Sequence, residues 1–236
     1  MARDFNGTSG KIQFDTTVGQ EGSTCYSFHF RLFRDTGGEG GYGQVFEWQD
    51  GGATARWWFE NDSGDAGWGA VFKVKWSGGD GAWSVAYPTN GIWYDYVVTY
   101  DGSSTANDPI IYRDGSSVTI TERAAPSGTL PINQTTLVIG NRIADDLTWD
   151  GRLAEFAIWN RVLTSTEANQ IGVGNSPLLI PGGLIFYSPL IGDTSPEPDL
   201  IGGITGTVTG TTQITHPTVY APNVITKKMY LVQGFQ

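Results

Sequence analysis

Apolar and polar residues alternate with a period of two along most of the chain, which is the pattern of half-buried β-strands. In residues 28–32, for example, phenylalanine and leucine share one face, and His29 and Arg31 point to the other. Turn-forming residues separate such segments about every 8–12 residues, a rhythm typical of a β-sandwich or barrel. The predicted strands are residues 11–14, 27–33, 71–76, 83–87, 93–100, 110–112, 118–120, 136–139, 153–159, 184–187 and 206–209.

One segment carries the signals of a helix. Thr164 and Glu167 have the spacing of a capping box, in which the hydroxyl and the carboxylate each satisfy an exposed backbone N–H. Gly172 and Gly174 favour an end shortly afterwards. We therefore predict a single short helix near residues 164–172 in an otherwise all-β protein.

The composition excludes several classes of protein. Nine tryptophans among 236 residues argue against intrinsic disorder, and a net charge of −10 disfavours nucleic-acid binding. One cysteine, Cys25, and two histidines cannot form an internal disulfide or a Cys/His zinc site. No apolar run approaches the roughly 18 residues of a membrane span, and none follows the N-terminal charges. We expect neither membrane insertion nor a signal peptide.

The motifs typical of enzymes are weak in this sequence. Gly38, Gly40 and Gly43 match the string of a dinucleotide-binding loop, but a strand-like segment follows where that loop requires a helix. No Gly-x-Ser-x-Gly nucleophile elbow is present. These observations predict a binding or structural protein rather than an enzyme.

One group of carboxylates invites comparison with the acids of a glycosidase. Glu60, Asp62 and Asp65 are closely spaced, and glycosidases use one acid to attack and another to protonate the glycosidic oxygen. The pair must share one face of a strand, whereas the intervening Asn61, Ser63 and Gly64 are loop formers. We therefore interpret the segment as a loop.

Acidic loops also supply the oxygen ligands that Ca²⁺ prefers. Two clusters qualify: Asp62 with Asp65, and Asp145 with Asp146 and Asp150. Neither has the Asp-x-Asp-x-Asp-Gly spacing of a calcium loop, so a solvated loop is the favoured interpretation of each. No cofactor is predicted, and calcium at Asp145, Asp146 and Asp150 is the alternative left open.

The tryptophans are concentrated in one part of the chain. Seven of the nine lie between Trp48 and Trp93. Most of them are expected in the core, but Trp57 and Trp58 are adjacent, and successive side chains of a strand point to opposite sides. One of these two rings is thus expected to face away from the core. Trp57 and Trp58 are the candidate residues for stacking on a glycan.

Several segments together resemble a known family. They are residues 4–8, 93–102, 111–115, 139–142 and 150–164. The resemblance is to the laminin-G/pentraxin-like branch of the concanavalin A-like jelly rolls, and it covers residues 1–175. It implies two stacked antiparallel sheets and the binding of carbohydrate or protein without catalysis.

The later part of the chain resembles the same family in a changed order. Residues 183–190, 198–200 and 206–210 are similar to the segment that normally precedes the Asp4-Phe5 strand, as in a circular permutation. Such a rearrangement is tolerated where the chain ends lie close together. We predict one domain, residues 1–215, in which residues 183–210 supply the permuted strands, followed by an extended C-terminal arm, residues 216–236.

This arrangement resembles laminin-G-like proteins of tailed bacteriophage particles. The resemblance implies a non-enzymatic virion protein, either a capsid decoration or an adsorption component, made in the host cytoplasm and displayed as a homo-oligomer. Its partner would be the major capsid protein or another virion protein.

The C-terminal arm is the candidate partner-binding segment, because an extended chain can add hydrogen bonds to an exposed sheet edge. Packing of the arm on its own domain is left open. The candidate residues of the arm are Tyr220, Val224, Lys227, Lys228, Tyr230 and Phe235.

Two alternatives to the virion role remain. The first is a carbohydrate-binding, lectin-like module, which could use calcium and bind a host-surface glycan through Trp57 or Trp58. The second is a glycosidase that uses Glu60 with Asp62 or Asp65.

Overall fold

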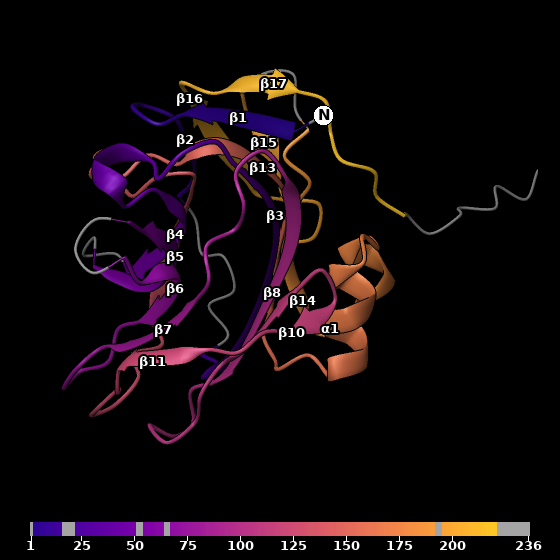
Figure 1. Ribbon diagram of the computed structural model, residues 1–236. Helices are drawn as coiled ribbons and strands as arrows, with labels where there is room; N and C mark the ends of the chain where they lie inside the picture. Colours follow the sequence, from indigo (N-terminus) through magenta and orange to yellow (C-terminus); the bar gives the residue numbers. More distant parts are fainter. Residues whose placement is uncertain (1, 16–21, 51–53, 64–66, 192–194, 221–236) are drawn as a thin grey trace, which may run out of the picture.

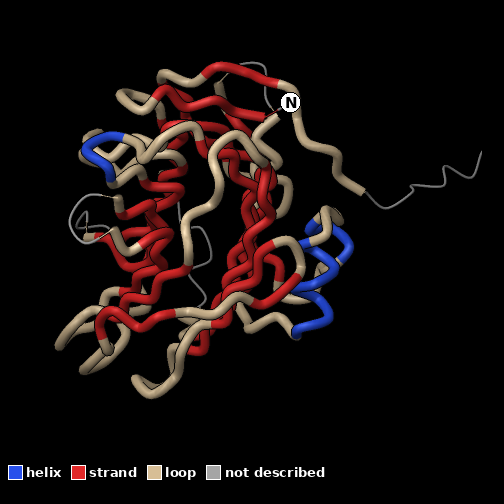
Figure 2. The backbone as a smooth tube through the Cα atoms, viewed as in Figure 1, coloured by secondary structure: helices blue, strands red, loops and turns tan. Residues whose placement is uncertain are grey.

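The structure is a computed structural model that describes residues 2–15, 22–50, 54–63, 67–191 and 195–220 (Figure 1). Two antiparallel sheets are stacked face to face, and one α-helix lies on the outer side of one of them (Figure 2). The predicted all-β jelly roll with two antiparallel sheets and one short helix is thereby confirmed.

The first sheet is built around the long strands β3 and β13. In spatial order it contains β10 (Ser116–Ser117), β9 (Ile110–Arg113), β8 (Trp93–Asp101), β3 (Cys25–Arg34), β13 (Asp150–Trp159), β1 (Ala2–Asn6) and β17 (Thr212–Ile214), and β14 (Leu184–Ser188) also pairs with β13.

The second sheet carries the candidate site on its outer face. In spatial order it contains β11 (Thr121–Ala124), β7 (Gly81–Val85), β6 (Gly69–Val74), β5 (Ala55–Asp62), β4 (Gln44–Asp50), β12 (Gln134–Ile139), β2 (Lys11–Phe14), β16 (Thr205–Thr209) and β15 (Glu197–Pro198). Two short 3-10 helices, η1 (Glu39–Gly41) and η2 (Pro177–Leu179), lie in connections.

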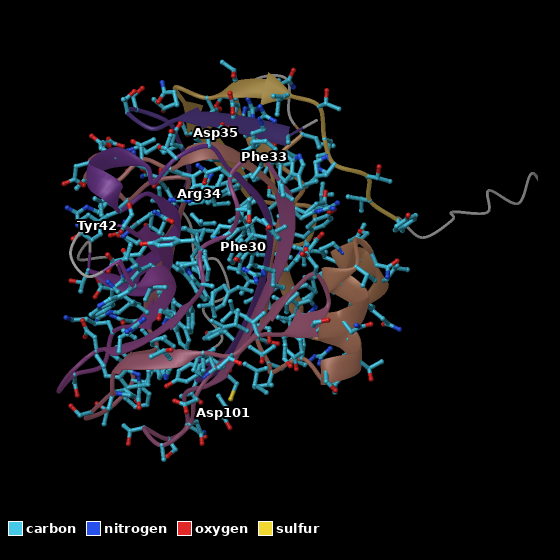
Figure 3. The ribbon with its side chains drawn as sticks, viewed as in Figure 1. Phe30, Phe33, Arg34, Asp35, Tyr42 and Asp101 are labelled. Carbon is cyan, nitrogen blue, oxygen red and sulfur yellow. The ribbon has the colours of Figure 1, made fainter. Side chains whose placement is uncertain are left out.

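The core between the sheets is filled with aromatic rings contributed by both layers. Phe30 lies between the two layers (Figure 3). Its ring centroid is 4.8 Å from that of Phe59 in the second sheet and 5.7 Å from that of Tyr96 in the first. Aromatic pairs at such separations add to the free energy gained by burial. The alternating apolar positions of the strands therefore meet at one interface.

Helix α1 (Ser165–Gly172) covers part of the outer face of the first sheet (Figure 1). Thr164 accepts from the backbone of Glu167, and the Glu167 side chain accepts from the backbone of Thr164, so the capping box is present as predicted. Ala168 and Ile171 of the helix belong to a second buried apolar cluster that includes Trp159 of the sheet. Among the described residues, no helix has the length and apolarity needed to cross a membrane.

Residues 184–214 complete both sheets beside the N-terminal strands. β14 pairs with residues 156–159 of β13, next to the stretch of that strand that pairs with β1. β16 pairs with β2, and β17 pairs with β1. This placement fits the predicted insertion of 183–210 into the sandwich, while the circular permutation itself stays a prediction.

The predicted strand at residues 118–120 is wrong. The returning strand of that hairpin is β10, and the turn is made by Asp114 and Gly115, whose φ angles are 51° and 76°. Two residues with positive φ close a tight hairpin, and the returning strand ends at Ser117, after which the Val118 N–H donates the last bond of the hairpin to the Ile111 carbonyl (2.8 Å).

The start of the predicted C-terminal arm packs on its own domain. The His216 Nε2 atom lies 3.1 Å from a carboxylate oxygen of Glu155. The backbone N–H of Tyr220 donates to Gly174 (2.9 Å), and that of Ser176 donates to Tyr220 (3.0 Å). Val224, Lys227, Lys228, Tyr230 and Phe235 lie outside the described residues. Binding of a neighbour by the arm therefore stays a prediction.

Candidate functional site

The outer face of the second sheet carries a row of three side chains of different chemistry. Strand register places Glu47 of β4 opposite Trp58 of β5, and Trp58 opposite Lys73 of β6. Directly opposed residues have Cβ atoms about 4.5–5.5 Å apart on the same face of a sheet. A carboxyl group, an indole and an ammonium group therefore lie side by side across three strands.

The two adjacent tryptophans of β5 have opposite environments. Trp57 is completely buried, and its ring lies 5.2 Å from Tyr26 in the core. Trp58 points to the outer face and is half-buried. The proposal of Trp57 as a glycan-stacking residue is therefore wrong, because the core encloses its ring, and Trp58 is the candidate that remains.

Glu60 shares the outer face with Trp58, two residues along the same strand. One carboxylate oxygen accepts from the Trp58 indole N–H (3.1 Å) and from the Gln44 amide (3.4 Å), and the other accepts from the Lys73 ammonium group. The interpretation of this segment as a loop is wrong at Glu60 and Asp62. Both residues belong to β5, because pairing with β6 continues as far as Asp62. Asp65 lies outside the described residues.

Glu47 is the carboxyl group of the row, and it is almost completely buried. The residue is 3% exposed, and its carboxyl group has no hydrogen-bond partner among the described residues. Burial raises its pKa to about 7, and the nearby Arg142 only partly opposes this effect. Near neutral pH, the group therefore exists in both protonation states, so it can donate to or accept from a hydroxyl group.

Gln49 provides a second unpartnered polar group on this face of β4. The residue is 1% exposed, and neither the oxygen nor the nitrogen of its side-chain amide has a partner among the described residues. A buried polar group without a partner costs about 1–3 kcal/mol. Glu47 and Gln49 are thus polar groups whose hydrogen-bonding capacity is unused within the fold.

A second indole lies near the row, which sequence analysis did not single out. The Lys73 ammonium nitrogen is 6.0 Å from the ring centroid of Trp58 and 5.8 Å from that of Trp68. The guanidinium carbon of Arg123 lies 5.7 Å from the same Trp68 ring. Trp68 precedes β6 in a glycine-rich segment, so no strand pattern marks its direction. The glycines on both sides of Trp68 interrupt the strand pattern, and they were the sequence signal that its ring is not packed in the core.

The arrangement suits recognition of a sugar. The C–H face of a pyranose ring is apolar and packs on the face of an indole, while its hydroxyl groups need donors and acceptors at the rim. Trp58 and Trp68 provide the faces. Glu47, opposite Trp58, provides the adjacent polar group.

The proposed calcium ligands do not form a metal site in the described part of the chain, where no three His, Cys, Asp or Glu side chains are grouped to bind an ion. Asp145 is paired with Lys11 (2.8 Å), and Asp146 is paired with Arg142 (2.6 Å). The Arg142 guanidinium holds the pKa of the Asp146 carboxyl below its usual range. Asp150 accepts from the hydroxyl of Thr36. This candidate site is therefore wrong, because separate partners engage the three carboxylates.

The comparisons with known proteins place this fold in a family. A model of the concanavalin A-like lectin/glucanases superfamily matches residues 6–169. The chain therefore belongs to the concanavalin A-like lectin/glucanase superfamily, as the resemblance indicated. No curated protein matches the chain in sequence.

Solved structures share the fold at low sequence identity. A Bacteroides ovatus protein described as carbohydrate-binding has a TM-score of 0.64 and 19% identity, over 94% of this chain and 61% of its own. The heptameric SAP-like pentraxin of Limulus polyphemus has a TM-score of 0.59 and 16% identity, over 87% and 94%. Domain 4 of the Geobacillus stearothermophilus arabinanase AbnA, solved with arabinotriose, has a TM-score of 0.50 and 14% identity, over 72% and 76%. The chain thus spans less than two thirds of the Bacteroides protein.

Proposed function

We propose that this protein is a carbohydrate-binding module that holds its ligand, without cleaving it, on the outer face of the second sheet. The observation that carries the proposal is the half-buried indole of Trp58 directly opposite Glu47, a buried carboxyl group with no partner among the described residues. An apolar face beside an unused donor and acceptor is the combination that a sugar ring requires.

The family and its structural relatives support this proposal in a general way. The superfamily joins lectins with glucanases, and two of the structures with this fold are a protein described as carbohydrate-binding and a domain complexed with arabinotriose. Binding is favoured over hydrolysis because both oxygens of Glu60 are held by side chains of the protein, among them Trp58 and Lys73.

Trp58→Ala is expected to lower the affinity for the bound glycan about tenfold or more, because stacking on an aromatic ring contributes about 0.5–1.5 kcal/mol beyond the buried area. A glycan array identifies the ligand, and calorimetric titration measures the affinity. Trp93→Ala is the matched control, since Trp93 is also half-buried but lies in the first sheet, where it packs on Phe33.

The outcomes of this experiment separate the alternatives. If no glycan on the array binds, or if Trp58→Ala and Trp93→Ala lower the glycan affinity equally, the proposed site is wrong. Hydrolysis of a bound glycan that is abolished by Glu60→Gln would establish the glycosidase instead. Binding is expected to persist in EDTA, because the acids proposed for calcium are engaged by Lys11, Arg142 and Thr36.

The role as a virion protein stays a prediction beside this proposal. A capsid decoration or adsorption component could bind a host-surface glycan through the same face, so the two roles are compatible. Capsid or tail genes beside the gene of this protein would support the virion role, and their absence would count against it.

A further inference from the structure

All but one of the cationic side chains on and beside the outer face of the second sheet form ion pairs within the described part of the chain. Five of them are paired with a carboxylate of the protein: Lys11 with Asp145, Arg56 with Asp50, Lys73 with Glu60, Lys75 with Asp80, and Arg142 with Asp146. Arg123 on β11 is the exception, since no carboxylate of the described residues lies within ion-pair distance of it. Its positive charge is therefore not neutralised by the fold.

The guanidinium group of Arg123 is nevertheless held in place. Its Nε–H donates to the hydroxyl of Ser84 on the neighbouring strand β7 (2.8 Å), and its carbon atom lies 5.7 Å from the ring centroid of Trp68. These two contacts orient the group and leave its two terminal nitrogens available. A guanidinium group presents such nitrogens as a planar fork that matches the two oxygens of a carboxylate.

Arg123 lies at the end of the proposed binding surface. The Trp68 ring centroid lies 5.8 Å from the Lys73 ammonium nitrogen and 5.7 Å from the Arg123 guanidinium carbon, and Lys73 is also next to Trp58. A sugar stacked on Trp68 would thus place substituents of its ring close to the guanidinium fork. The charge of Lys73 is compensated by Glu60, so Arg123 is the group that selects for charge at this position.

We infer that the ligand is an acidic oligosaccharide, in which the carboxylate of a uronic acid unit is bound by Arg123 while its ring lies on Trp68. This inference rests on the proposed carbohydrate-binding function and specifies its ligand class.

The test uses the full chain and a panel of uronic acid oligosaccharides of several linkages, each with a twin whose carboxyl groups are reduced to alcohols. At least one acid is expected to bind about tenfold more tightly than its twin, since a bidentate charged pair is among the stronger hydrogen-bonding contacts. Arg123→Gln is expected to remove this preference, so that the acid and its twin bind with similar affinity. Arg123→Lys keeps the charge without the fork, and is expected to retain part of the preference.

Arg113→Gln is the matched control. The Arg113 guanidinium also lies over an aromatic ring, 5.4 Å from Tyr94, but it belongs to the first sheet. If acids and their reduced twins bind equally, and Trp58→Ala weakens the binding of both, the acidic ligand class is wrong and the carbohydrate-binding function stands. A preference for the acids that survives Arg123→Gln would overturn the role of Arg123. Absence of binding to any sugar, acidic or neutral, would overturn the proposed function itself.

Discussion

Trp57→Ala is expected to lower the free energy of unfolding by about 3–5 kcal/mol, the cost of removing a large aromatic side chain from a packed core. Trp57 is completely buried, and its ring contacts Tyr26, Phe28 and Tyr100 of the opposite sheet. The cavity left by the indole cannot close, because its neighbours belong to two hydrogen-bonded sheets. Denaturant unfolding followed by tryptophan fluorescence and circular dichroism measures the change.

Trp58→Ala is the natural comparison for this experiment, since the two indoles are adjacent in sequence. Its half-buried ring lies on the outer face, so its removal is expected to cost clearly less stability. Equal destabilisation by the two substitutions would show that both rings are core residues, and the proposed binding surface would lose its central residue.

Glu47→Gln is expected to change how stability depends on pH. Burial raises the pKa of Glu47 from the ordinary 4.5 to about 7 in the folded protein. The folded state therefore holds this proton more tightly than the unfolded state. The resulting contribution to stability is fully present below pH 4.5 and is lost as the pH rises through about 7. The loss amounts to up to about 3 kcal/mol, at 1.36 kcal/mol for each pKa unit.

The glutamine variant has no proton to lose, so its stability is expected to decrease less than that of the wild type between pH 5 and pH 8. Unfolding in urea at several pH values measures the difference between the two proteins, which separates Glu47 from the other groups that titrate in this range. Glu122→Gln is the control, because Glu122 is an exposed acid on the edge strand β11. Parallel stability curves for Glu47→Gln and the wild type would show that the carboxyl group is ionised throughout.

Much of the architecture followed from local patterns. Alternation identified the long strands, and the spacing of Thr164 and Glu167 identified the start of the helix, because both depend on contacts between residues close in the chain. The interpretation of residues 60–65 as a loop failed at Glu60 and Asp62, because pairing with β6 outweighed the local preference of Asn61.

The candidate site was predictable only in part. The run of adjacent aromatic residues required one ring to point away from the core, but the choice of Trp58 over Trp57 depends on which face of β5 meets the first sheet. Arg123 is far from Trp58 in sequence, and Trp68 lies outside any strand pattern. They reach the same face through the order of β11, β7, β6 and β5.

The amino-acid sequence alone determined a β-sandwich with one capped helix, an aromatic core and membership of a jelly-roll family, because periodicity, capping and turn chemistry act over a few residues. The tertiary structure alone decided which charges neutralise one another. It paired the acids proposed for calcium with Lys11, Arg142 and Thr36, it buried Glu47, and it left Arg123 without an ion-pair partner in the described part of the chain. These outcomes depend on strand order and register, which bring together residues far apart in the chain.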